Sequence, residues 1–137
     1  MSEPAHVVVT NPPFLDAARS RPSPLPARAV AHQQSGEDLD KWLRACGALV
    51  RPKGLLALIH RADRLHACLR HLPPGFGAIA IRPVHAQAER PAVRILVTAV
   101  KGSRAPLTIL RPLILNDGEG RFTDEAAAIH RGERLLT

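Results

Sequence analysis

Aromatic side chains are scarce in this chain of 137 residues, which has three phenylalanines, one tryptophan and no tyrosine. The core must therefore be built from aliphatic side chains. The two cysteines, Cys46 and Cys68, form no Cys-x-x-Cys pair, and their spacing on apolar helix faces predicts buried, reduced thiols in a cytoplasmic protein. The seven histidines show no metal-ligand spacing, so no metal site is predicted. No apolar run reaches membrane-spanning length, and the first residues show no signal peptide.

Acidic residues are fewer than basic ones, 12 against 19, which gives a formal net charge of +7. Of the 19 basic residues, 16 are arginine. A basic excess suits a polyanionic partner such as RNA. The alternative is a GC-rich genome that favours Arg, Ala and Pro codons, and the even spread of charge along the chain leaves both explanations open. The length is that of one domain.

The stretch VVVTNPPF, residues 7–14, is the most informative part of the chain. Its β-branched residues predict a buried strand over residues 6–11, and Pro12 and Pro13 end that strand in a stiff, extended turn. Ligands of open α/β sheets bind at the carboxyl ends of strands. A carboxamide (Asn11) before the prolines and a ring (Phe14) after them suit a flat ligand that carries an amino group. The alternative is a strand-ending loop without chemistry.

Residues 15–34 form a predicted flexible, basic loop, because several prolines exclude a regular helix or a central strand. A loop of this kind beside the Asn-Pro-Pro-Phe turn suits contact with phosphate groups, and the alternative is a solvated segment without function. Its arginines are Arg19, Arg21 and Arg28.

A helix is predicted from Ser35, an N-cap residue, with apolar residues at helical spacing that include Trp42 as a core residue. Pro52 and Gly54 are expected to end this helix. The apolar run of residues 55–59 then predicts a strand buried on both faces.

His60 and Arg61 follow that strand and should lie on the same rim of the sheet as Asn11. They are candidates for lining a substrate pocket, and the alternative is a solvated turn that leads into a helix ending near Leu72.

The segment GFGAIA, residues 75–80, matches a Gly-x-Gly-x-x-Ala pattern but precedes its strand, which is the wrong context for a dinucleotide-binding loop. Residues 79–84 and 92–100 are predicted to pair antiparallel, because the connection between them is too short for a crossover helix. Further on, residues 116–120 form a turn cluster and Thr123 caps a last helix.

This order of elements, together with the Asn-Pro-Pro-Phe turn, resembles class I S-adenosylmethionine-dependent methyltransferases that modify exocyclic or amide nitrogens. Within that family the chain is similar to bacterial tRNA (adenine-N6)-methyltransferases of the type that modifies a valine tRNA next to its anticodon. The segments that carry the resemblance are VVVTNPPFLDA, ALVRPKGLLALIHRADRL, RPAVRILVTAVKGSRAPL and LILNDGEGRFTDEAAAIHRG.

The resemblance implies a Rossmann-like α/β fold of which residues 1–137 are the second half, strands four to seven, ending in an antiparallel pair. It implies S-adenosylmethionine as cofactor and RNA, specifically tRNA, as substrate. The catalytic residues that it implies are Asn11, Pro12, Pro13 and Phe14, with Asn11 also beside the cofactor. The substrate-binding candidates are Arg19, Arg21, Arg28, His60 and Arg61.

The glycine-rich loop and the acidic residue through which this family binds its cofactor have no counterpart in the sequence. We therefore expect the chain to be a fragment, a late start or one piece of a split enzyme, inactive by itself and exposing strand 7–10 as an unpaired edge. That edge would self-associate or pair with an amino-terminal half. The alternative to an enzyme is a non-catalytic basic module that binds RNA or a protein.

Overall fold

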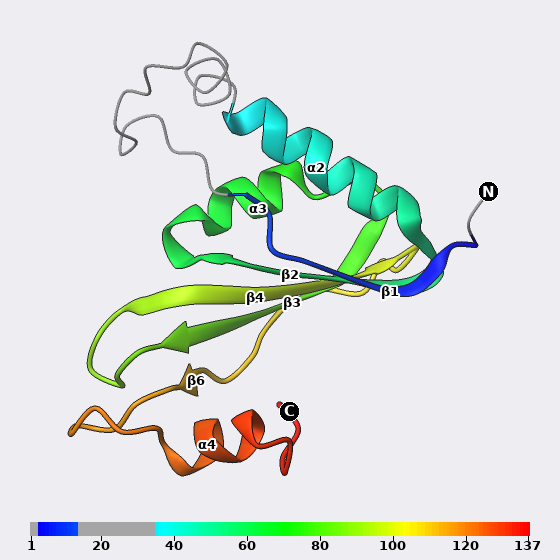
Figure 1. Ribbon diagram of the computed structural model, residues 1–137. Helices are drawn as coiled ribbons and strands as arrows, with labels where there is room; N and C mark the ends of the chain where they lie inside the picture. Colours follow the sequence, from blue (N-terminus) through cyan, green and yellow to red (C-terminus); the bar gives the residue numbers. More distant parts are fainter. Residues whose placement is uncertain (1–2, 14–34) are drawn as a thin grey trace.

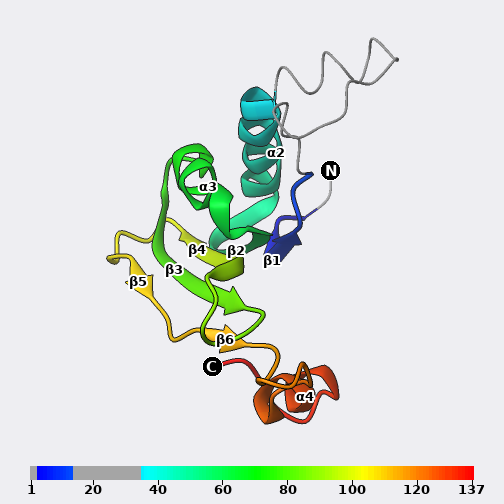
Figure 2. The same cartoon turned by 90° about the vertical axis from the view of Figure 1, so that its left-hand side faces the viewer.

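The computed structural model describes residues 3–13 and 35–137, and for residues 35–37 it describes the backbone alone. In the described part, two helices cover one face of a mixed sheet, and a third helix lies beyond its other face (Figures 1 and 2). The elements in chain order are β1 Ala5–Thr10, α2 Ser35–Leu49, β2 Val50–Arg61, a 3-10 turn Ala62–Arg64, α3 Leu65–His71, β3 Phe76–His85, β4 Ala92–Lys101, β5 Thr108–Ile109, β6 Leu113–Ile114 and α4 Asp124–His130.

The described strands are ordered β1-β2-β4-β3-β5, and β6 also pairs with β3. β1 and β2 are parallel, whereas β4 runs antiparallel to both β2 and β3. The predicted first strand, the helix that begins at Ser35 and the antiparallel pair are confirmed as elements. The prediction that the first strand is buried is wrong, because among the described strands β1 pairs with β2 alone, and Val7 and Val9 are exposed. The assignment of this arrangement to the second half of a larger fold stays a prediction.

The hydrophobic core lies between the sheet and the helices α2 and α3. Its members are aliphatic apart from one thiol, as the shortage of aromatic residues predicts. Burial raises the pKa of that thiol, Cys68, to about 11, so it stays protonated. Cys46 is half-buried, and both cysteines are free. The core residues are Leu39, Leu43, Leu58, Ala67, Cys68, Ile81, Ile95 and Val97.

The predicted end of α2 at Pro52 and Gly54 is wrong, because α2 ends at Leu49 and β2 already begins at Val50. The ladder between β1 and β2 shifts register between Ala5 and Val7, which face Val50 and Leu55, so residues 51–54 bulge out of the strand. A proline is tolerated in such a bulge because no ladder hydrogen bond is required of it. Gly54 fits there because a Cβ atom would come within 2.7 Å of Val50 Cγ1 and 2.8 Å of the Arg51 carbonyl oxygen.

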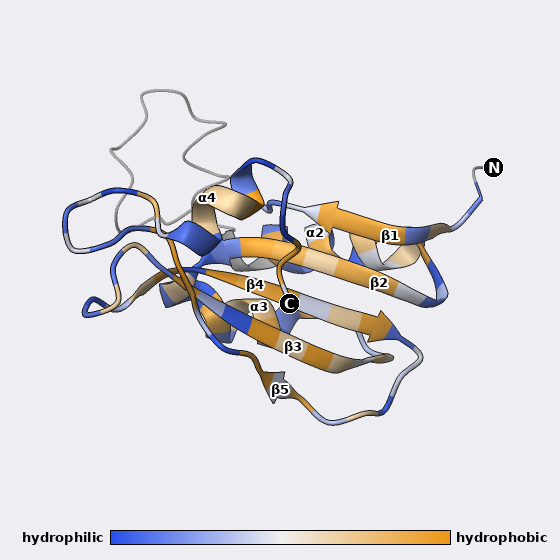
Figure 3. Cartoon of the chain, turned by 90° about the horizontal axis from the view of Figure 1, so that it is seen from below, coloured by the Kyte–Doolittle hydropathy of each residue, from blue (hydrophilic) through white to orange (hydrophobic). Residues whose placement is uncertain are grey.

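The prediction that residues 55–59 are buried on both faces is also wrong. Leu56 and Leu58 are buried beneath the helices, whereas Leu55, Ala57 and Ile59, which point the other way, are only half-buried. Figure 3 shows this open face of the sheet, with the apolar strands β1 and β2 at one side and β3 and β5 at the other.

Within the described part of the chain, side chains on the open face are buried only near β3. There Arg82 and Val84 are buried, and the Arg82 guanidinium donates a 2.9 Å hydrogen bond to the Arg111 carbonyl oxygen. The predicted cap of α4 is confirmed, since the Thr123 hydroxyl accepts from the Ala126 N–H and donates to the Ile114 carbonyl oxygen.

Candidate functional site

The carboxyl ends of β1 and β2 meet at one rim of the sheet, because the two strands are parallel and Thr10 lies opposite Leu58. The Asn11-Pro12-Pro13 turn leaves the sheet at this rim, as the sequence predicts. Asn11 and Pro13 are exposed and Pro12 is buried. A buried proline between two exposed residues anchors the turn while the Asn11 carboxamide stays accessible to a ligand.

Trp42 is the functional candidate that the sequence misassigned. It is 42 % exposed rather than part of the core, and its Nε1–H donates a 2.8 Å hydrogen bond to Thr10 Oγ1. Thr10 is buried and directly precedes Asn11. The indole therefore fixes the last residue of β1 and, with it, the start of the turn.

His60 is buried at the end of β2, and its Nδ1 accepts a 2.8 Å hydrogen bond from the Arg61 backbone N–H. Burial lowers the pKa of His60 below its ordinary value of 6.5, and Arg64 lowers it further, while Asp63 acts in the opposite direction. The ring is therefore neutral at pH 7 and carries its proton on Nε2. The interpretation of this stretch as a solvated turn is wrong for His60, and its role toward a substrate stays a prediction.

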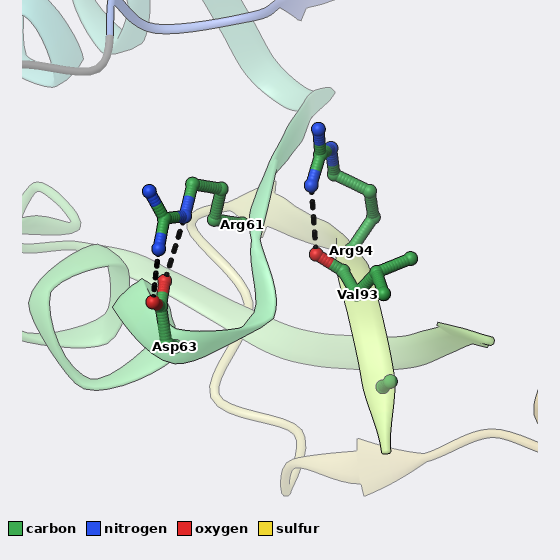
Figure 4. A pocket seen from close by; sticks show the side chains of 5 residues that line it. Arg61, Asp63, Val93 and Arg94 are labelled. Carbon is green, nitrogen blue, oxygen red and sulfur yellow. Dashed lines mark hydrogen bonds and ion pairs between the residues drawn. The ribbon is translucent and has the colours of Figure 1, made fainter. Parts of the chain in front are cut away.

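Arg61 and Arg94 flank a surface hollow of about 420 Å³ at the same rim (Figure 4). Arg61 is half-buried and pairs with Asp63 through Nε at 3.1 Å and through a terminal nitrogen. The side chain of Arg94 leaves the neighbouring strand and donates to the Val93 carbonyl oxygen at 3.0 Å. We call this the arginine hollow, and its lining is Arg61, Asp63, Ala92, Val93 and Arg94.

The remaining predicted site residues lie outside the described part of the chain. They are Phe14, the loop of residues 15–34 and its arginines Arg19, Arg21 and Arg28. Their roles stay predictions.

A cofactor would find only part of a binding site among the described residues. The Gly-x-Gly segment does not form a cradle, because a Cβ atom on Gly77 would come within 2.0 Å of the Ser103 carbonyl oxygen. Gly77 thus serves the close approach of two backbone segments, which agrees with its rejection as a dinucleotide-binding loop. The described residues also hold no cluster of metal ligands, and none of their helices is long and apolar enough to cross a membrane.

The fold is similar to that of a solved structure described as a predicted O-methyltransferase from Agrobacterium tumefaciens. The sequences are 29% identical, and the TM-score is 0.73. The likeness covers 96% of this chain but 53% of that one, so the chain spans about half the length of its structural relative. No protein-family model matches the chain, and a comparison with curated proteins gives no match. The chain therefore has a methyltransferase-like α/β fold.

Proposed function

We propose that the chain is the substrate-side part of an S-adenosylmethionine-dependent methyltransferase that acts on the N6 amino group of adenine in tRNA. The observation that carries the proposal is the Asn11-Pro12-Pro13 turn, which lies at the carboxyl rim of a methyltransferase-like sheet with its carboxamide exposed. The seven positive charges in excess, and the arginines of the predicted loop 15–34, suit a polyanionic substrate.

The turn presents hydrogen-bond acceptors to a group that has two hydrogens to donate. An adenine amino nitrogen is a poor nucleophile because its lone pair is delocalised into the ring. The Asn11 side-chain oxygen and the Pro12 carbonyl can each accept one amino hydrogen, which holds the nitrogen in place and favours its pyramidal form. Pro12 and Pro13 fix the direction of these acceptors, and Phe14 would stack on the base once it has left its own stack.

S-adenosylmethionine would supply an electrophilic methyl group. Of the residues that would hold this cofactor, the described part of the chain offers Asn11. It lacks the glycine-rich loop of the family that the chain resembles. We therefore expect no measurable binding of S-adenosylmethionine to the 137-residue chain by titration calorimetry. A dissociation constant in the micromolar range would show a cofactor site in this chain.

Methylation of a hydroxyl is the second candidate, because the solved relative is described as a predicted O-methyltransferase. A hydroxyl nucleophile must lose a proton. His60 at this rim has its Nδ1 lone pair engaged by the Arg61 N–H and its other nitrogen protonated, so it does not offer a base. An amino nucleophile needs no base before attack, which favours the nitrogen as acceptor.

The experiment is a methyl-transfer assay on tRNA, followed by mass spectrometry of the digested nucleosides. It uses the 137-residue chain and, where the coding DNA continues in frame upstream of Met1, the longer protein. N6-methyladenosine supports the proposal, and a 2′-O-methyl nucleoside supports the second candidate. A protein that binds RNA and transfers no methyl group in either form would instead be the non-catalytic module.

Asn11→Ala in the active form should lower kcat by about 10²–10³-fold, the scale of one lost hydrogen bond that is preorganised for the transition state. Asn116→Ala is the matched control, because Asn116 lies in the turn before α4, where its amide donates to the Gly120 carbonyl oxygen. Phe14→Ala should cost about 1–3 kcal/mol in kcat/KM, the scale of a lost stacking contact. Full activity of Asn11→Ala would mean that the turn only ends the strand and takes no part in catalysis.

A further inference from the structure

The ladder between β2 and β4 sets two arginines directly opposite each other, Arg61 and Arg94. Like charges at facing positions of a sheet destabilise it. Such a pair in a folded protein calls for negative charge nearby, either from the protein itself or from a ligand.

Among the described residues, Asp63 supplies a negative charge to this pair. Asp63 accepts from two nitrogens of Arg61, whereas the hydrogen bond of Arg94 goes to an uncharged group, the Val93 carbonyl oxygen. The lining of the arginine hollow, two arginines and one aspartate, therefore keeps one net positive charge. Arg94 is exposed, and its guanidinium has five N–H donors, so the hydrogen bond to Val93 leaves donors for a ligand.

The potential around the hollow is positive beyond its own lining. Among the described residues, Arg64, Arg61 and Arg94 all disfavour a proton on the buried ring of His60, and Asp63 acts in the opposite direction. An anion at this rim would therefore enter a field that attracts it.

We propose that the arginine hollow binds a phosphodiester group of the RNA substrate next to the target base, with Arg94 as the residue that contacts the phosphate. The inference rests on the proposed function for the identity of the RNA. The single negative charge of a phosphodiester matches the single unbalanced positive charge of the lining. Arginine is suited to phosphate because its planar fork can donate two parallel hydrogen bonds.

The position of the hollow fits a phosphate that flanks the base. β4 is separated from β1 by β2 alone, and neighbouring strands are about 4.8 Å apart, so the rim extends roughly 10 Å from the Asn11 turn to Arg94. The same rim can thus hold both a base at the turn and the phosphate that flanks it. The turn would recognise the base, and the hollow would set the register of the RNA along the rim.

The test measures the binding of a fluorescently labelled, single-stranded RNA that contains adenine, by anisotropy over a series of salt concentrations. Wild type is compared with Arg94→Gln and with the matched control Arg104→Gln. Arg104 is exposed and follows the other end of β4, so this variant loses the same charge away from the hollow. Arg94→Gln should weaken binding and lower the slope of log K against log salt by about 0.7, the value for one phosphate contact of a single strand. Arg104→Gln should keep the wild-type slope.

Equal slopes for the two variants would overturn the inference while leaving RNA as the substrate. No binding of RNA by wild type would overturn the proposed RNA substrate together with the inference. Inorganic phosphate at constant ionic strength separates a phosphodiester site from a site for free anions. A rise in Tm with phosphate that Arg94→Gln abolishes, combined with an unchanged RNA slope, would assign the hollow to a free anion and overturn its role in RNA binding.

Discussion

At the scale of single residues, the start of the candidate turn is held by one hydrogen bond between two elements that are far apart in the sequence. The Trp42 indole N–H donates to Thr10 Oγ1, and Thr10 is buried at the end of β1. Because Trp42 is the single tryptophan of the chain, its fluorescence reports on this rim. A ligand that stacks on the turn should therefore change the emission of Trp42.

A double-mutant cycle tests this hydrogen bond. Trp42→Phe and Thr10→Val should each lower the free energy of unfolding by about 1 kcal/mol, because each leaves the other polar partner without its bond. The double variant should lose little more than either single variant, and the coupling energy should be about 1 kcal/mol. Unfolding followed by circular dichroism measures all four proteins. Strictly additive losses would mean that the contact contributes nothing to stability.

The second prediction concerns His60, whose pKa is below its ordinary value of 6.5 in the folded chain because the ring is buried. The unfolded chain therefore binds a proton at a higher pH than the folded chain does. The contribution of His60 to stability is complete above pH 6.5 and is lost as the pH falls through 6.5 toward the lower, folded pKa.

His60→Gln removes this dependence and leaves the other histidines in place. As the pH falls from 8 to 5.5, the free energy of unfolding of wild type should decrease more than that of His60→Gln. Denaturant titrations at fixed ionic strength give this difference directly. Parallel curves over the whole range would show that His60 titrates alike in both states.

At the scale of elements, close backbone contacts decide where the strands run. β3 begins at Phe76, and the connection that follows β4 passes directly over Gly77, with the Gly102 N–H donating to the Gly75 carbonyl oxygen at 2.6 Å. Only a residue without a side chain fits there, because the nearest atom belongs to the backbone of Ser103.

Gly77→Ala should therefore destabilise the chain by about 1–3 kcal/mol or more, because the segment that carries Ser103 must move away. Gly118→Ala is the control, since a Cβ atom there meets nothing within 4 Å and its backbone needs no positive φ. The control should stay within about 0.5 kcal/mol of wild type. Thermal or denaturant unfolding compares the two, and an equal effect of both variants would contradict the close approach.

At the scale of the whole molecule, the sheet is unevenly covered. Among the described strands β1 pairs on one side only, with β2, and Val7 and Val9 are 52% and 75% exposed. Beside this edge lies an apolar groove of about 320 Å³ on β1, β2 and β4. Its lining is Val9, Ala57, Leu58, Ile59, Leu96, Val97 and Thr98. An exposed apolar edge next to an apolar groove favours pairing with another strand.

We predict that the chain self-associates through this edge and that Val9→Lys shifts it toward the monomer. A lysine on an edge strand opposes pairing by charge, and Val9 is too exposed for the change to cost much stability. Sedimentation velocity over a range of concentrations measures the shift. Ile109→Lys, on β5 at the opposite edge, is the matched control because Ile109 is 69% exposed. A monomeric wild type, or an equal effect of both lysines, would contradict association through β1.

The sequence by itself determined the features that depend on local chemistry. β-Branched residues before two prolines placed β1 and its turn, helical spacing after Ser35 placed α2, and a short polar connection required β3 and β4 to be antiparallel. These signals are local because the backbone geometry of prolines and the reach of a short loop do not depend on the rest of the chain.

Only the tertiary structure decided which faces are covered and which charges meet. Trp42 lies at helical spacing with the core residues, yet the sheet ends beneath it, so its ring stays half in solvent and reaches Thr10. Pro52 would end a helix, but strand pairing extends β2 through a bulge around it. Arg61 and Arg94 are 33 residues apart and face each other only through the register of β2 and β4. The register of paired strands and the burial of each sheet face are set by packing between segments that are far apart in the sequence. A local sequence pattern therefore does not predict them.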